Sequence, residues 1–235
     1  MPSIVITGGT RGIGKSILMK FAREGFDIST CARNENELDG LKKVLAMDYP
    51  SVKTFLKRCD VSIKADIKEF GMDLEKEMGV PDIIINNAGV FIPGKIQDEG
   101  DDAFETQINT NLSSAYHLTR QLLPGMIQRK SGYIFNICST ASIIAYTNGG
   151  SYCISKFALL GFSKVLREEL KHHDIRVTSV LPGATNTSSW ELSNLPSERF
   201  IDPNNIANLI FTFYTLPIDT VVEEIVVRPL LGDID

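Results

Sequence analysis

The stretch "SIVITGGTRGIG", residues 3–14, runs from an apolar segment typical of a buried β-strand into a turn with four glycines. A segment with helical periodicity follows directly, up to Glu24. Gly8 allows a sharp turn, while Gly12 and Gly14 leave room for a phosphate group and for the first strand. The N–H groups at the start of the helix then face an anion. This order predicts a dinucleotide-binding site, and the alternative is a glycine-rich turn without a ligand.

The same alternation of strand and helix continues along the chain. Strands are predicted at 3–7, 27–32, 52–60, 82–86, 133–139, 176–182 and 221–227. Helices are predicted at 14–24, 34–46, 64–78, 101–128 and 203–216, and a further one carries Tyr152. Seven strands alternating with helices indicate an α/β fold, a doubly wound Rossmann-type parallel sheet flanked by helices on both faces. We expect a single domain over residues 1–235, with a substrate-lid segment at about 184–200.

Composition excludes several classes of function. The chain has 235 residues, 43% hydrophobic and 23% charged, and a net charge of −5, which argues against nucleic acid or an anionic membrane as the partner. Its four cysteines form no CxxC pair and no metal-ligand spacing, so reduced thiols and no metal site are expected. The uncharged segment 131–155 is too polar to span a bilayer, and no signal peptide is evident. A cytoplasmic location is therefore expected.

Two arginines lie where the adenosine ribose of a dinucleotide should be. The second predicted strand is followed by Arg33, and Arg11 lies in the glycine turn. Two guanidinium groups and no carboxylate suit a 2′-phosphate, so the sequence predicts NADPH; the alternative is that both arginines are merely solvated. Asp60 ends the third predicted strand, where it could accept a hydrogen bond from the adenine amino group or cap a helix.

Residues 151–156, "SYCISK", place Tyr152 and Lys156 on one face of a helix. Such a pair is usually a surface contact when it occurs alone. Beside a nucleotide site it has a chemical use, because an ammonium group favours the phenolate and lowers the pKa of a tyrosine. The tyrosine could then give a proton to a ketone oxygen while the cofactor gives a hydride to its carbon. Ser139 could donate to the same oxygen and orient it.

Five motifs together resemble the short-chain dehydrogenase/reductase family: "TGGTRGIG" (7–14), "NNAG" (86–89), Ser139, "YCISK" (152–156) and "PG" (182–183). They occur in the family's order and cover nearly the whole chain. The resemblance implies the catalytic set Ser139, Tyr152, Lys156 and Asn111, the last holding a water in a proton relay. It also implies cofactor contacts at Gly8, Thr10, Arg11, Gly12, Ile13, Gly14, Arg33, Asp60, Val61, Asn87, Ala88, Gly89, Tyr152, Lys156, Pro182, Gly183, Thr185 and Thr187.

The sequence says less about the substrate-binding site than about the cofactor-binding site. The C-terminal "TVVEEIVVRPLLGDID" and the tryptophan after "PG" resemble family members that reduce sepiapterin-like pterins. That resemblance implies a small carbonyl substrate, bound by Ser139, Tyr152 and Trp190. Trp190 could stack on a flat heterocycle, or it could be a packing residue.

Three alternatives to this carbonyl reductase stay open. A 3-oxoacyl thioester reductase should carry a basic patch for an acyl carrier beside the pocket, and segment 184–200 offers only Arg199. A broad-specificity alcohol dehydrogenase is the second. A catalytically silent NADP-sensing protein is the third, and it should have lost Tyr152 or Lys156. By resemblance, the last strand and the Tyr152 helix are subunit contacts, which implies a homotetramer or homodimer.

Overall fold

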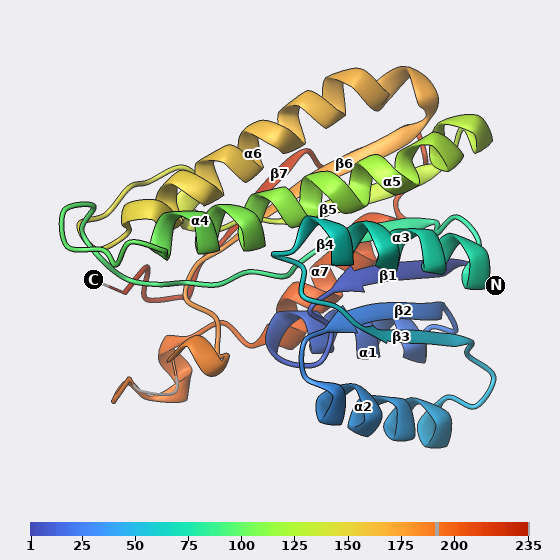
Figure 1. The fold of residues 1–235 in the computed structure, drawn as a ribbon, viewed down its shortest axis with the longest axis horizontal. Helices are drawn as coiled ribbons and strands as arrows, with labels where there is room; N and C mark the ends of the chain where they lie inside the picture. The colour runs from blue at the N-terminus through green and yellow to red at the C-terminus, as the bar shows by residue number, and fades with distance from the viewer. Residues whose placement is uncertain (191–192, 235) are drawn as a thin grey trace.

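The computed structural model describes residues 1–190 and 193–234. Their strands form one seven-stranded parallel sheet in the order β3-β2-β1-β4-β5-β6-β7 (Figure 1). The strands are β1 Ser3–Thr7, β2 Asp27–Ala32, β3 Thr54–Arg58, β4 Ile83–Asn86, β5 Gly132–Ile137, β6 Ile175–Pro182 and β7 Glu224–Val227. This confirms the predicted fold class. The strand order reverses between β1 and β4, and ligands of such sheets bind at the carboxyl ends of the strands at this position.

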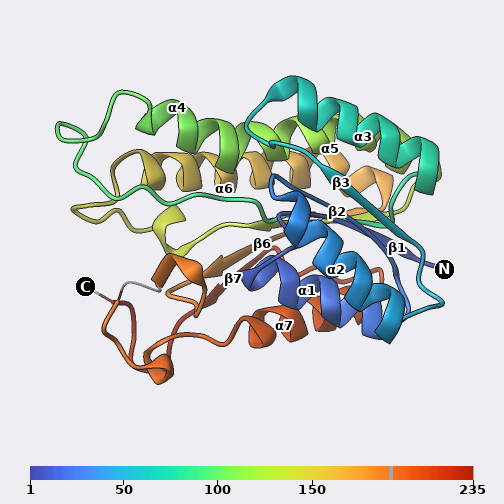
Figure 2. The same ribbon diagram turned by 60° about the horizontal axis from the view of Figure 1, so that its bottom comes forward.

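Helices cover both faces of the sheet (Figure 2). The helices are α1 Gly12–Arg23, α2 Glu35–Asp48, α3 Lys64–Met78, α4 Ala103–Ile108, α5 Ser114–Arg129, α6 Gly150–Leu170 and α7 Pro203–Thr215. One face carries α1, α2 and α7, and the other carries α3 to α6. The central strands are therefore buried from both sides: Ile4 and Ile83 point to one face, Val5 and Ile84 point to the other, and all four are 0% exposed.

A π-helical turn interrupts the long helical region predicted at 101–128. The turn spans Asn109–Ser113 and joins α4 to α5. Its i→i+5 hydrogen bonds insert an extra residue into the helix, and such insertions gather at functional sites. The turn contains Asn111, which is 1% exposed.

Two strands are at least three residues shorter than predicted, and both lie at the edges of the sheet. β3 begins at Thr54 rather than at 52, because the N–H of Lys53 donates to the Asp27 carboxylate over 2.9 Å. β7 begins at Glu224 rather than at 221 and pairs only with β6. An edge strand pairs with only one neighbouring strand. The residues at which it begins and ends therefore depend on local contacts more than on its own sequence pattern.

None of the helices in residues 1–190 and 193–234 combines the length and the apolar character needed to cross a membrane.

Candidate active site

The glycine turn after β1 is bonded to the segment after β4. The Oγ1 of Thr7 accepts from the backbone N–H of Asn87 at 3.1 Å and of Ala88 at 3.0 Å. The Nδ2 of Asn87 donates to the backbone oxygen of Gly8 at 3.2 Å. A Cβ on Gly14 would lie 2.3 Å from that same oxygen, so only glycine fits where α1 begins. These contacts bring two of the predicted cofactor motifs together at the switch point of the sheet.

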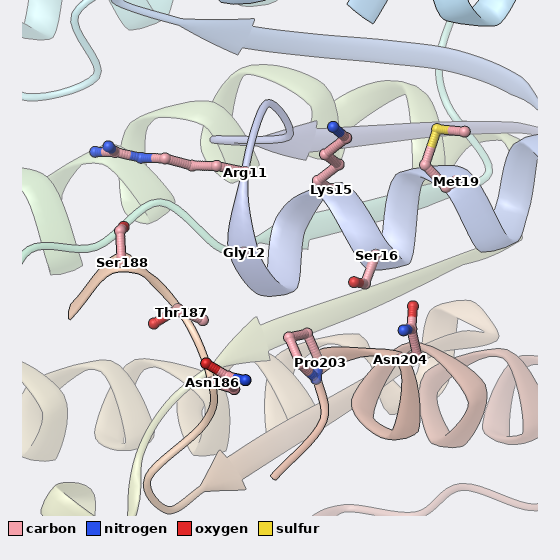
Figure 3. Close-up of a pocket in the computed structure, with 10 residues that line it drawn as sticks. All are labelled: Arg11, Gly12, Lys15, Ser16, Met19, Asn186, Thr187, Ser188, Pro203 and Asn204. Carbon is pink, nitrogen blue, oxygen red and sulfur yellow. The ribbon is translucent and has the colours of Figure 1, made fainter. Parts of the chain in front are cut away.

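A cavity of about 640 Å³ lies beside the start of α1 (Figure 3). Gly12 has a φ of +55°, and Arg11 precedes the helix without a side-chain hydrogen bond to its first N–H groups. The described lining residues are Arg11, Gly12, Lys15, Ser16, Met19, Asn186, Thr187, Ser188, Pro203 and Asn204. Two cationic side chains next to a helix N-terminus fit the phosphate groups of a dinucleotide.

The adenosine side of this cleft contains a carboxylate that the sequence analysis missed. Arg33 follows β2 and is exposed, as expected for a phosphate ligand. However, the hydroxyl of Thr10 donates to Oε2 of Glu37 at 2.6 Å. The end of β2 itself carries no carboxylate, as predicted, but Glu37 reaches the glycine turn from the first turn of α2. The spacing of Glu37, three residues after Asn34, is that of a capping box at a helix start and does not signal a contact with Thr10.

Asp60 stabilises a turn rather than a helix. Its Oδ1 accepts from the N–H of Ser62 at 3.0 Å and from the Ser62 hydroxyl at 2.7 Å. The residue that precedes the first turn of α3 is Ile63, so the helix-cap alternative is wrong. Adenine contact by Asp60 and by Val61, which is partly buried beside it, stays a prediction.

Ser139, Tyr152 and Lys156 converge although they come from different elements. Ser139 follows β5, and the other two lie in the first two turns of α6. Lys156 is 5% exposed, and its Nζ donates to the backbone oxygen of Ile137 at 2.8 Å. That ammonium lies 5.8 Å from the centre of the Tyr152 ring. A Cβ on Gly89 would lie 3.6 Å from the same Nζ, so the glycine keeps space open beside the ammonium.

The pKa values in this cluster are set mainly by burial. Burial raises the pKa of Tyr152, and its hydrogen bond with Ser139 offsets only part of that rise. Burial also lowers the pKa of Lys156 to about 8. The prediction that Lys156 lowers the pKa of Tyr152 is therefore not met by the polypeptide alone. The reason is desolvation, which disfavours the charged form of both groups.

Comparison with known proteins identifies the family. The sequence model of the family described as short chain dehydrogenase matches residues 2–196. The chain is 32% identical to a sepiapterin reductase of Chlorobaculum tepidum, over 98% of this chain and 97% of the relative. The chain belongs to the short chain dehydrogenase family. It is thus an oxidoreductase of a family that uses nicotinamide cofactors.

Solved structures of other short chain dehydrogenases share the fold over the full length. A metagenomic short-chain oxidoreductase in complex with NADP has a TM-score of 0.84 at 28% identity, covering 98% of each chain. A short-chain dehydrogenase from Sphingobium yanoikuyae in complex with NADPH has a TM-score of 0.85 at 27% identity, covering 98% of this chain and 88% of that one.

Asn111 links α6 of this short chain dehydrogenase to the segment after β4. Its Oδ1 accepts from Val90 N at 2.7 Å, and its Nδ2 donates to Val90 O at 3.0 Å and to the Ser155 hydroxyl at 2.9 Å. The side-chain amide is thus engaged by protein groups. A water of the proton relay at Asn111 stays a prediction. Because the side chain already bonds to protein groups, such a water would have to bind the main chain of Asn111, whose hydrogen bonding the π-helical turn changes.

Glu99 is a second residue that the sequence analysis missed. It lies in the loop before α4, and its Oε1 accepts from the N–H of Ser151 at 2.8 Å. The Oε2 of Glu99 also accepts from the Ser151 hydroxyl. Gly149, the residue before α6, has no side chain to cap the helix, so Glu99 supplies the cap from a distant part of the chain. No local spacing signals a partner that lies about fifty residues away in sequence.

The segment after β6 lies against the glycine turn. A Cβ on Gly12 would lie 3.1 Å from the Cγ2 of Thr187, while Thr185 is 5% exposed and donates to the oxygen of Gly183. Trp190 packs against Phe200, with ring centroids 5.3 Å apart, which is the packing role considered above. Residues 191–192 of the predicted lid segment lie outside the described residues.

Proposed function

We propose that this protein is an NADPH-dependent reductase that converts a ketone to an alcohol. The observation that carries the proposal is the convergence of Ser139, Tyr152 and Lys156 beside the glycine at position 89. Bound NADPH would supply the hydride. The polypeptide must then orient the carbonyl group and deliver one proton to its oxygen.

Each of the three side chains has a group suited to its task. The Oγ of Ser139 accepts from the N–H of Ala141 at 3.1 Å, and its hydroxyl hydrogen would turn from Tyr152 to the substrate oxygen. Tyr152 holds the proton to be transferred: a phenol is protonated at neutral pH, and burial raises its pKa further. Lys156 uses one hydrogen on Ile137, so two further N–H groups are available for the ribose hydroxyls of the cofactor.

The choice of NADPH rests on Arg11 and Arg33. Both guanidinium groups are exposed at the adenosine end of the cleft, where they suit a 2′-phosphate. Solved relatives in complex with NADP or NADPH support this choice. We place the carboxamide of the nicotinamide near Thr185 and Thr187, beyond Pro182 and Gly183, because that segment runs from the end of β6 to the glycine turn.

We propose a sepiapterin-like pterin as the substrate. The support is the similarity to a sepiapterin reductase and an aromatic surrounding of the catalytic phenol. The Phe91 ring lies 4.8 Å from that of Tyr152 at an interplanar angle of 64°. Trp190 would add a further ring if the segment that carries it moved over the substrate.

A substrate panel tests this assignment. Oxidation of NADPH should be measured with sepiapterin, small diketones and acetoacetyl thioesters at matched concentrations. We expect the highest kcat/KM with sepiapterin. Equal rates on all three would remove the pterin assignment and favour a broad-specificity dehydrogenase. No turnover on any of them, with NADP still bound, would favour a nucleotide-sensing protein.

One observation weighs against the thioester alternative. Arg199 was the only cation of segment 184–200 available to an acyl carrier. In the structure its guanidinium donates to the backbone oxygens of Gly232 at 3.4 Å and Asp233 at 3.2 Å. This arginine therefore holds the C-terminal tail.

We also infer a homotetramer or homodimer that forms through α6 and β7, as the resemblance implies, and through the neighbouring α5, with the whole chain acting as one domain in the cytoplasm. Large apolar side chains remain exposed on these helices: Tyr116 42%, Ile154 43%, Phe157 45% and Val165 54%. An apolar surface of this kind marks a protein–protein contact.

A further inference from the structure

Glu37 lies at the adenosine end of the cleft without a role in the proposed reaction. Its Oε2 accepts the hydroxyl hydrogen of Thr10 at 2.6 Å, and its Oε1 accepts from the Nδ2 of Asn34 at 3.3 Å. In return, the Oδ1 of Asn34 accepts from the backbone N–H of Glu37 at 3.3 Å. The carboxylate is therefore held over the glycine turn by the start of α2 and by the turn itself.

The charge of Glu37 is not neutralised by the arginines of the same site. Neither Arg11 nor Arg33 forms an ion pair with it in the described part of the chain. The adenosine end thus combines two cations, which attract a 2′-phosphate, with one anion, which repels it. A carboxylate can also accept a hydrogen bond from a free ribose hydroxyl, as acidic residues do in NAD sites.

We propose that Glu37 is a specificity residue that opposes the 2′-phosphate and accepts from an unphosphorylated ribose, so that the protein uses NADH as well as NADPH. This rests on the proposed function, which places the adenosine half of the cofactor at Arg11 and Arg33. Thr10 connects Glu37 with the proposed cofactor site, because its hydroxyl lies in the glycine turn and donates to Glu37.

The test uses fragments of the cofactor that lack nicotinamide. Binding of adenosine 2′,5′-bisphosphate and of 5′-AMP to the full-length protein is measured by calorimetry. Glu37→Gln keeps an acceptor for Thr10 and removes the charge. We expect the bisphosphate to bind about three- to tenfold more tightly to this variant, because one charge contact or hydrogen bond contributes a factor in this range. The affinity for 5′-AMP should be unchanged or lower.

Glu35→Gln is the matched control. It removes the same charge from the same turn of α2, and the side chain of Glu35 is exposed. An unchanged ratio of the two affinities in Glu37→Gln, or an equal change in Glu35→Gln, would overturn the proposal. A thermal unfolding scan of each variant checks that both are folded.

Two further results separate this proposal from the proposed function. Arg33→Ala should weaken the bisphosphate and spare 5′-AMP; if it does not, the NADPH choice fails whatever Glu37 does. If the protein reduces no ketone but Glu37→Gln still changes the relative affinity for the two fragments, the proposed reaction is refuted. The role of Glu37 in cofactor specificity then stands. Failure of both fragments to bind overturns both.

Discussion

Tyr152 is a phenol whose burial and hydrogen bond act on its pKa in opposite directions, and burial is the larger effect. For a reductase this favours the acid form, which must hold a proton before hydride arrives. Oxidation of an alcohol needs the phenolate instead. Within the proposed function, the phenol therefore holds its proton at neutral pH, and the raised pKa also makes it a weaker acid for the transfer.

Replacement of Tyr152 by phenylalanine tests this role. The variant retains the ring that packs against Phe91 and loses only the hydroxyl. We expect kcat for ketone reduction to fall by about 10²–10⁴-fold, the usual contribution of general acid catalysis. The Kd for NADPH, measured by fluorescence, should stay within a few-fold of the parent value. Turnover at the parent rate would sink the assignment.

Lys156 provides a prediction about stability and pH. Its pKa falls from 10.5 in the unfolded chain to about 8 in the folded protein because of burial. Between these values the unfolded chain binds more protons, so the free energy of unfolding rises with pH. Relative to Lys156→Met, the parent protein should gain on the order of 2 kcal/mol between pH 8 and 10.

Urea denaturation at the two pH values measures this difference. Taking the difference from Lys156→Met removes the titration of the groups that do not interact with Lys156, as both proteins share them. Parallel pH dependence of the two proteins would contradict the lowered pKa of Lys156.

The positions of side chains were predictable where a motif fixes them and not where a contact joins distant parts of the chain. The positions of Ser139, Tyr152 and Lys156 followed from their motifs and the order of the elements. The carboxylate of Glu37 was missed because it reaches the glycine turn from a different helix, although its capping spacing was visible. Trp190 showed the opposite problem, since its type suggested a ligand while its neighbour Phe200 gives it a packing role.

At the scale of elements, α6 depends on a loop far from it in sequence. The loop that carries Glu99 also approaches the start of the helix at Gly94, whose N–H donates to the oxygen of Asn148 at 3.0 Å. Because Ser151 directly precedes Tyr152, a shift of this cap moves the catalytic phenol.

Glu99→Ala removes the cap, while Glu99→Gln retains an acceptor for the Ser151 N–H. We expect Glu99→Ala to cost about 1 kcal/mol of stability, as for other helix caps, and to lower kcat about tenfold. The KM for NADPH should not change, since the glycine turn is not affected. Glu99→Gln should restore most of kcat.

The neighbouring Asp98→Ala serves as the control, because the side chain of Asp98 is exposed. If Glu99 only stabilised the fold, Glu99→Ala would lower the stability but would not lower kcat while leaving KM unchanged. That outcome, or no rescue by Glu99→Gln, would argue against a positioning role.

Element boundaries followed the sequence where periodicity was strong. The helix predicted at 64–78 is α3 without any shift, and the one predicted at 203–216 ends a single residue earlier, at Thr215. The π-helical turn at Asn109–Ser113 was not predicted. It depends on the three hydrogen bonds of the Asn111 side chain to other elements, which no local pattern encodes.

At the scale of the whole molecule, the parallel sheet was predictable because each buried strand is an apolar run separated by a helix from the next. Assembly was not, since it depends on a second copy. The exposed apolar side chains of α5 and α6 lie on the face of the sheet that also carries α3 and α4 (Figure 2).

Light scattering after size-exclusion chromatography measures the assembly. We expect a dimer or tetramer for the parent protein and a smaller species for Phe157→Asp, because a charge is costly to bury at a contact. Met47→Asp is the control, since Met47 is an exposed apolar residue of α2, on the other face of the sheet. A monomeric parent protein would refute the proposed assembly.

The contacts of the C-terminal tail have a practical consequence for laboratory work. Arg199 and Arg228 both bond to this tail, Arg228 through an ion pair with Asp233 at 2.8 Å. The N-terminus lies at the opposite end of the molecule (Figure 1). A purification tag at the C-terminal end lies close to these contacts of Arg199 and Arg228, whereas one at the N-terminal end lies far from them. Kinetic constants are best measured on N-terminally tagged or tag-free protein.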